Sequence, residues 1–196
     1  MDLWDDWAVH HKKLGLHDVR TSKDGIADEA KFYACSQRVL FILRDTNNYD
    51  GDMREGMKQG LGGWFRTIAT WATGIIRNFP EYKKFEDNQL KESLQSVALI
   101  NVKKVVGGYP TNMEQVNAFA YTDRILLRKQ IEEINPTVIV GCGTYHILPW
   151  LLEPNVSPYE ISGDKFMWGS IPVVRMRHPL FANVKNTYEE LKTILK

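Results

Sequence analysis

The sequence has little cysteine and no long apolar stretch. Its 196 residues include two cysteines, Cys35 and Cys142, which are too few for a disulfide framework, a four-cysteine zinc site or an iron–sulfur cluster. No apolar run approaches the roughly 20 residues that cross a bilayer, and the start of the chain lacks the apolar core of a signal peptide. We therefore expect a cytoplasmic protein without a membrane span, in a reducing compartment.

An excess of charge of one sign is missing too. The 25 Lys and Arg residues balance 24 Asp and Glu residues, for a net charge of +1, so the overall charge predicts no partner and an anion site needs local clustering. His10, His11 and His17 fit no standard metal site, because no cysteine or acidic ligand set accompanies them. We expect neither a metal nor a cofactor.

Four short apolar runs predict buried strands. They cover residues 38–44, 96–102, 136–142 and 171–177. Each run is nearly continuous in Val, Ile and Leu instead of alternating with polar residues, which is typical of parallel strands covered on both faces.

The segments between these runs fit helices. Apolar residues recur at helical spacing within 62–79 and 112–134, and in 186–195 Thr187 is followed three residues later by Glu190, the spacing of a capping box.

This order of elements predicts an α/β fold with three layers, α/β/α, around a mostly parallel four-stranded sheet. We expect residues 1–196 to form a single domain, with residues 1–36 as a helical part packed on its core.

Polar and basic residues gather where the predicted strands end. In open parallel sheets, ligands bind beyond the carboxyl ends of the strands, here residues 44–52, 101–110, 141–146 and 177–186. Five basic residues at this edge favour phosphate binding: Arg44, Lys103, Lys104, Arg177 and Lys185.

Several residues at this edge could carry chemistry. Asp45 directly follows the first strand, where a carboxylate can act as a general base; like Asn47, it could also simply form a turn. Asn101 ends an apolar strand and offers the donor and acceptor that read a base edge, or else an internal backbone bond. Pro179 is expected to hold His178 in an extended conformation, from which His178 could donate a hydrogen bond to developing negative charge. It could also be a loop histidine with no functional role.

Two apolar residues, Leu180 and Phe181, come next in a short loop among basic residues. Such a pair can wedge into a base stack or pack beneath the loop. Cys142 has no evident His–Asp partnership, and we do not expect it to be a nucleophile.

Taken together and in order, these motifs resemble the uracil-DNA glycosylase superfamily over about residues 38–196. "FILRDTNN", "ALIN" and "RHPLF" stand at the places of its three motifs, and "NPTVIVGCG" resembles its third strand. Arg44 replaces the glycine of the first motif, and Leu180 the serine of the last. The chain therefore resembles a divergent member.

The resemblance implies a DNA glycosylase that hydrolyses the N-glycosidic bond of uracil or a related damaged base. Asp45 or Asn47 would orient water, His178 would donate to the departing base, and Asn101 would read the pyrimidine edge. Tyr49, Trp64 or Phe65 would stack on the flipped base. The resemblance further implies a monomer that holds DNA through Arg44, Lys103, Lys104, Arg177, Pro179, Leu180, Phe181 and Lys185.

Two other classes of function stay open. The altered first motif is compatible with a catalytically inactive nucleic-acid-binding module of the same fold. The near-neutral charge slightly favours a nucleoside or nucleotide hydrolase. Fold alone cannot choose among the three, because function depends on the site.

Overall fold

The computed structural model describes residues 3–17, 19–108, 110–153 and 163–196. Within them, six strands form one mixed sheet in the order β1-β3-β2-β4-β6-β5. The strands are β1 (Gly25–Ile26), β2 (Val39–Asp45), β3 (Ala98–Lys103), β4 (Val138–Cys142), β5 (Lys165–Trp168) and β6 (Ile171–Met176). The four predicted strands are β2, β3, β4 and β6, which are parallel. The expected four-stranded sheet is thus extended at its edges by the antiparallel strands β1 and β5.

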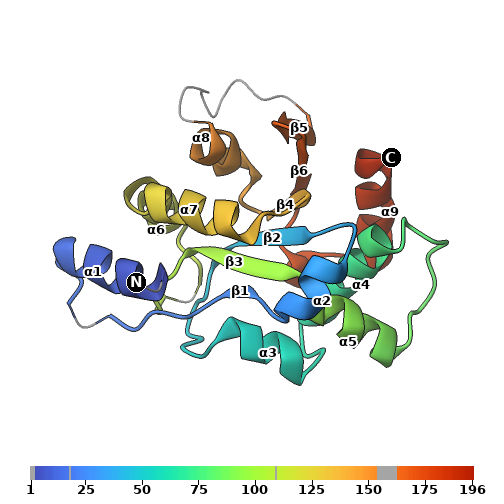
Figure 1. Cartoon of the computed structure of the whole chain (residues 1–196), viewed down its shortest axis with the longest axis horizontal. Helices are drawn as coiled ribbons and strands as arrows, with labels where there is room; N and C mark the ends of the chain where they lie inside the picture. The colour runs from blue at the N-terminus through green and yellow to red at the C-terminus, as the bar shows by residue number, and fades with distance from the viewer. Residues whose placement is uncertain (1–2, 18, 109, 154–162) are drawn as a thin grey trace.

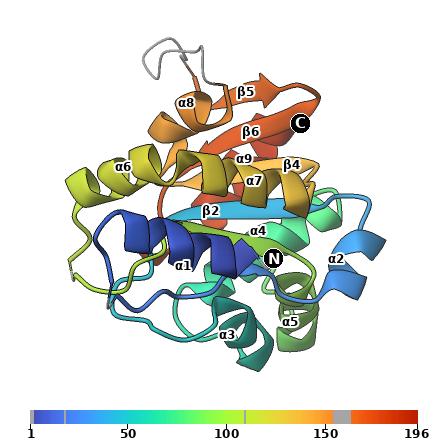
Figure 2. The same ribbon diagram turned by 60° about the vertical axis from the view of Figure 1, so that its left-hand side comes forward.

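Both faces of the sheet are covered by helices (Figures 1 and 2). Helices α3, α4, α5 and α9 bury apolar side chains against one face, and α1, α2, α6, α7 and α8 against the other. Their bounds are α1 Leu3–Lys13, α2 Glu29–Ala34, α3 Met53–Gln59, α4 Phe65–Ile76, α5 Asp87–Gln95, α6 Met113–Thr122, α7 Arg124–Ile134, α8 Leu148–Leu152 and α9 Val184–Leu195.

Strand β2 shows why its apolar run is continuous. Phe41 and Leu43 point into the core beneath α4 and α9, whereas Leu40 and Ile42 point into the core beneath α6 and α7. All four side chains are at most 1% exposed. Burying a side chain of this size stabilises the fold by about 1.5–3 kcal/mol, so neither face of the strand tolerates a polar residue.

The segment expected to be one helix over 112–134 is two helices. Asp123, with φ −96° and ψ 3°, separates α6 from α7. Its carboxylate is fully buried and lies 3.1 Å and 3.2 Å from Nε2 of His10 and His11. The break therefore supplies the carboxylate that anchors α1 to the α6–α7 junction.

The start of α9 also differs from the prediction. Asn183 caps the helix, because its side chain accepts a hydrogen bond from the Asn186 backbone N–H. Thr187 is already inside α9: its hydroxyl donates to the Asn183 carbonyl at 2.8 Å and accepts from Nε1 of Trp71 at 3.1 Å. The predicted Thr187 capping box is wrong, since another strong cap-former lies four residues earlier.

The N-terminal part is not purely helical. Strand β1 lies between α1 and α2 and pairs with β3, while Trp7 of α1 is buried in the core. Residues 1, 2 and 18 of the predicted helical part lie outside the described residues. No described helix has both the length and the hydropathy needed to span a membrane.

The strand order fixes where a ligand can bind. The chain passes from β2 to β3 on one side and then returns to β4 on the other side of β2. The connections after β2 and β4 therefore diverge, and in open α/β sheets ligands typically bind at such a point, beyond the carboxyl ends of the strands.

Candidate active site

A cavity of about 170 Å³ opens at the carboxyl end of β2. Its lining comes from three stretches that are far apart in the sequence, within residues 43–53, 64–65 and 178–180. We call it the site cavity; it is lined by Leu43, Asp45, Thr46, Asn47, Tyr49, Met53, Trp64, Phe65, His178 and Leu180.

Most of the predicted catalytic and base-binding residues line this cavity. The structure brings together Asp45, Asn47 and His178, together with the aromatic residues predicted to stack on a base, Tyr49, Trp64 and Phe65.

Asp45 is the last residue of β2 and is only 8% exposed. Its Oδ1 accepts a hydrogen bond from the Thr111 hydroxyl at 3.0 Å, whereas Oδ2 has no hydrogen-bond partner among the described residues. Burial raises the pKa of the Asp45 carboxyl, against the opposite influence of Thr111, Lys103 and Arg44. A carboxyl with a raised pKa and an unpaired oxygen is suited to accepting a proton.

Asn47 lies beside Asp45 in the loop after β2. Its φ of 49° is left-handed, a conformation that asparagine tolerates better than most residues. The carbonyl of Asn47 accepts from the Gly107 backbone N–H at 2.7 Å, and its side-chain Oδ1 lies 3.2 Å from the Thr111 hydroxyl. The loops after β2 and β3 are thus tied together. Thr111 was not predicted; its only signal in the sequence is that it directly follows residues 101–110, the stretch expected at the carboxyl end of the second predicted strand.

His178 caps the single turn Pro179–Phe181, with the extended backbone expected before a proline (φ −61°, ψ 134°). Its Nδ1 accepts a hydrogen bond from the Leu180 backbone N–H at 3.3 Å. Burial first, and then the positive charge of Arg44, lower the pKa of His178 to about 4. The ring is therefore neutral at pH 7, and because Nδ1 is an acceptor, its proton lies on Nε2.

Arg44 reaches His178 across the turn that follows β4. Gly143 at this turn has φ 73°, and a Cβ there would lie 3.6 Å from Cδ and Nε of Arg44 and 3.7 Å from Cβ of His178. Nε of Arg44 is buried and has no hydrogen-bond partner among the described residues. The close packing on Gly143 places a positive charge beside the histidine.

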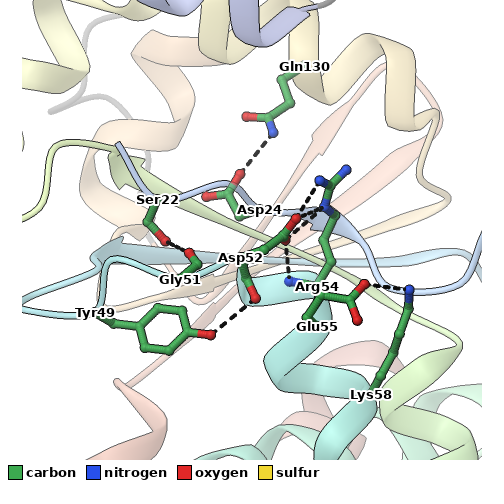
Figure 3. Close-up of polar contacts among 9 residues, drawn as sticks. All are labelled: Ser22, Asp24, Tyr49, Gly51, Asp52, Arg54, Glu55, Lys58 and Gln130. Carbon is green, nitrogen blue, oxygen red and sulfur yellow. Dashed lines mark hydrogen bonds and ion pairs between the residues drawn. The ribbon is translucent and has the colours of Figure 1, made fainter. Parts of the chain in front are cut away.

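Aromatic rings form one wall of the site cavity. The ring centroids of Trp64 and Phe65 are 4.3 Å apart, and those of Trp64 and His178 are 6.4 Å apart. On the loop after β2, the Tyr49 hydroxyl donates to the Asp52 carbonyl at 3.1 Å. Figure 3 shows this contact beside a second tie, in which the Ser22 hydroxyl donates to the carbonyl of Gly51.

The loop after β6 is apolar and exposed beside the cavity. Leu180 is 55% and Phe181 is 69% exposed, and Arg177 and Lys185 are exposed as well. Pro179, predicted to contact DNA, is buried, unlike the two apolar residues that follow it.

Lys104, predicted to bind phosphate, points into the core. Its side chain is fully buried, and Nζ lies 2.7 Å and 2.8 Å from the two carboxylate oxygens of Asp24. Nζ is also 5.8 Å and 5.5 Å from the ring centroids of Trp4 and Trp7. A phosphate cannot reach this ammonium group without opening the core.

The side chains of Asn101 and Lys103 also point into the interior of the protein. The Asn101 backbone N–H donates to Oδ2 of Asp24 at 2.8 Å, and its side-chain Nδ2 donates to the same oxygen at 3.4 Å. Asn101 is 1% exposed and does not line the site cavity, so the structure does not bring this predicted base-reading residue together with Asp45 and His178. Lys103, a predicted phosphate contact, is 4% exposed, and its Nζ donates to the Gly107 carbonyl.

Neither the family models nor the curated proteins that were searched contain a match to this chain. In the described parts of the chain, no group of three or more His, Cys, Asp or Glu side chains could hold a metal ion.

A larger groove of about 650 Å³ runs along the carboxyl ends of β4 and β6. Arg175 and Arg177 line it, but Asp164 and Glu190 do so too, and Arg175 lies 3.6 Å from the Asp164 carboxylate. Neither Asp45 nor His178 lines this groove, so we place the candidate active site in the smaller cavity, where a carboxyl group and a neutral imidazole converge.

Proposed function

We propose that the chain is a DNA glycosylase that removes uracil or a related damaged base by hydrolysing its N-glycosidic bond. The supporting observation is that Asp45, with a raised pKa, and neutral His178 line one small cavity. The carboxylate would orient water and stabilise an oxocarbenium-like sugar. Nε2–H of His178 would donate to the negative charge that develops on the departing base.

The cavity supplies groups for a flipped base as well. Tyr49, Trp64 and Phe65 would stack on the ring, and the Asn47 amide would read its polar edge in place of Asn101. Leu180 would fill the gap that the flipped nucleotide leaves in the duplex. Extrusion costs a few kcal/mol and is easiest for damaged or mispaired bases.

Phosphate contacts would come from the exposed arginine and lysine beside this loop, Arg177 and Lys185, with Arg44 nearer the cavity. The resemblance to the uracil-DNA glycosylase superfamily supports the same proposal, with the chain as a divergent, monomeric, cytoplasmic member that needs no metal. Its altered first motif would leave Asp45 as the carboxylate that activates water.

Base release from labelled oligonucleotides tests the proposal. Each oligonucleotide carries one uracil, either single-stranded or opposite guanine or adenine, and alkali cleaves the abasic product. We expect strand breaks that fall by about 10²–10⁴-fold in Asp45→Asn and in His178→Ala, the range of general acid–base catalysis. His17→Ala is the matched control, since His17 is an exposed histidine that does not line the cavity.

Other outcomes of the same assay separate the alternatives. Salt-sensitive DNA binding without base release would replace the proposal with an inactive binding module, for which the substitution at Arg44 in the first motif is the motivating feature. Neither release nor binding, with activity on free nucleosides, would favour a nucleoside hydrolase.

A further inference from the structure

Three polar side chains, from the end of β2 and from the loops after β2 and β3, meet at the site cavity. The Thr111 hydroxyl oxygen lies 3.0 Å from Oδ1 of Asp45 and 3.2 Å from Oδ1 of Asn47. Asp45 and Asn47 line the cavity, whereas Thr111 does not. Thr111 therefore contacts both residues without being part of the cavity lining.

The hydrogen count at this junction depends on the charge of Asp45. A threonine hydroxyl has one hydrogen to donate. If Asp45 is ionised, that hydrogen faces two acceptor oxygens and satisfies only one of them fully. If Asp45 is protonated on Oδ1, it donates to Thr111, and Thr111 donates to Oδ1 of Asn47, so every oxygen has a hydrogen.

When Asp45 is ionised, the hydrogen bonding is equally complete if the Asn47 amide flips, so that Oδ1 and Nδ2 exchange places. Thr111 then donates to Oδ1 of Asp45, and Nδ2–H of Asn47 donates to the Thr111 oxygen. The oxygen and the NH₂ group of an amide have nearly the same size, so this flip needs little extra space. The end of the amide that faces away from Thr111 changes from Nδ2–H to Oδ1.

We propose that Thr111 is a positioning residue that makes the orientation of the Asn47 amide follow the protonation state of Asp45. When solvent protonates Asp45, Asn47 presents Nδ2–H to the cavity and binds a ligand acceptor such as a carbonyl. When Asp45 is ionised, Asn47 presents Oδ1 and binds a ligand N–H group. The proposed function enters only in identifying this ligand as a base.

The charged groups around Asp45 set the pH at which it changes its protonation state. Lys103 of β3 and Arg44 of β2 favour the carboxylate, and burial opposes them. His178 and Tyr49 face the same cavity. Because His178 lines the same cavity and also titrates at acidic pH, the test must separate its titration from that of Asp45.

Side-chain NMR of the full chain tests the relay without any assay of catalysis. The probes are the ¹³C carboxyl signal of Asp45, the ring signals of His178 and the ¹⁵N amide signals of Asn47, each followed against pH. In the wild type we expect the Asn47 signals to move with the midpoint of Asp45 and not with that of His178. In Thr111→Val they should stop following Asp45, whose own titration midpoint rises because the hydrogen-bond donor that lowers its pKa is lost.

Thr111→Ser keeps a hydroxyl and should restore the wild-type titration. Thr193→Val removes an exposed hydroxyl on α9 and controls for the substitution itself. Asn47 signals that stay flat through the Asp45 midpoint in the wild type would overturn the relay, even if Thr111→Val failed to fold. Tracking that persists in a folded Thr111→Val would overturn it too. Coupled titration of Asp45 and Asn47 in a protein that releases no base would contradict only the proposed glycosylase activity.

Discussion

Nζ of Lys104 lies 2.7 Å and 2.8 Å from the two carboxylate oxygens of Asp24, and both side chains are completely removed from solvent. The same carboxylate accepts hydrogen bonds from the Asn101 backbone and, at 2.9 Å, from the Gln130 amide, a contact visible in Figure 3. Burial lowers the pKa of Lys104, and Asp24 acts in the opposite direction. One carboxylate thus joins the N-terminal segment to β3 and α7.

Removing this ammonium group should destabilise the fold. Lys104→Met leaves Asp24 buried without its countercharge, and breaking a buried pair in this way lowers the free energy of unfolding by about 3–5 kcal/mol. Urea denaturation followed by circular dichroism measures the change. Lys185→Met is the control, because an exposed lysine should change stability by no more than about 0.5 kcal/mol. Equal stability of the two variants would contradict the role given to the pair.

The pKa of His178 predicts a pH dependence of stability. The pKa is about 4 in the folded protein, below the ordinary value of 6.5 for a histidine side chain. As pH falls from 6.5 to 4, the unfolded chain binds a proton at this ring and the folded chain does not, so the free energy of unfolding decreases. His178→Gln removes this contribution, and we expect a shallower decrease across that window in urea titrations at several pH values.

Two comparisons isolate the effect of His178. His17→Gln replaces an exposed histidine and should keep the wild-type slope. Asp45, whose pKa is raised, acts with the opposite sign: its protonation favours the folded state as pH falls. His178→Gln and wild type share Asp45, so its contribution cancels in their difference, and parallel curves for these two proteins would refute the lowered pKa.

The sequence predicted the central sheet better than its edges. Runs such as 38–44 are continuous in apolar residues because both faces of the strand are buried. Strand β1 has two residues, Gly25–Ile26, and β5 alternates between exposed and half-buried residues over Lys165–Trp168. Neither segment is long or apolar enough to be recognised as a strand, so the antiparallel edges were missed.

The candidate site shows a similar division. Asp45 ends β2, and Asn47 and His178 lie just beyond strands, and strand order alone brings such positions together. Asn101 lies in the second half of β3 and Lys104 directly follows it, but Asp24, from a segment about 80 residues earlier, holds both in the interior. That contact depends on tertiary structure and leaves no local pattern in the sequence.

Gly51 is predicted to be required for the placement of Tyr49. A Cβ at Gly51 would lie 2.6 Å from the Tyr49 hydroxyl oxygen, so Gly51→Ala should displace the ring from the wall of the site cavity. Because Tyr49 is 42% exposed, the ring can move toward solvent, and we expect a change in stability below about 1 kcal/mol. A crystal structure of the variant would reveal the displacement, and base release should slow several-fold if Tyr49 stacks on the base.

Gly60→Ala serves as the control for this substitution. A Cβ at Gly60 would meet nothing within 4 Å, and its φ of 170° is extended. Wild-type base release in Gly60→Ala together with slow release in Gly51→Ala would assign the effect to Tyr49. An unmoved Tyr49 ring in Gly51→Ala would contradict the prediction.

The exposed pair Leu180 and Phe181 should matter for duplex DNA more than for single strands. Their apolar side chains are 55% and 69% exposed to water, which is unfavourable for apolar surface. Insertion into a gap in a base stack would bury them. Because unstacking a paired base costs a few kcal/mol, we expect Leu180→Ala/Phe181→Ala to slow base release from duplex DNA by about tenfold or more. Release from a single strand should change far less, because no stack has to be opened. Ile125→Ala, an equally apolar and 82% exposed position on α7, should affect neither substrate. Equal losses on duplex and single-stranded DNA would show that the pair contributes to the cavity and not to base flipping.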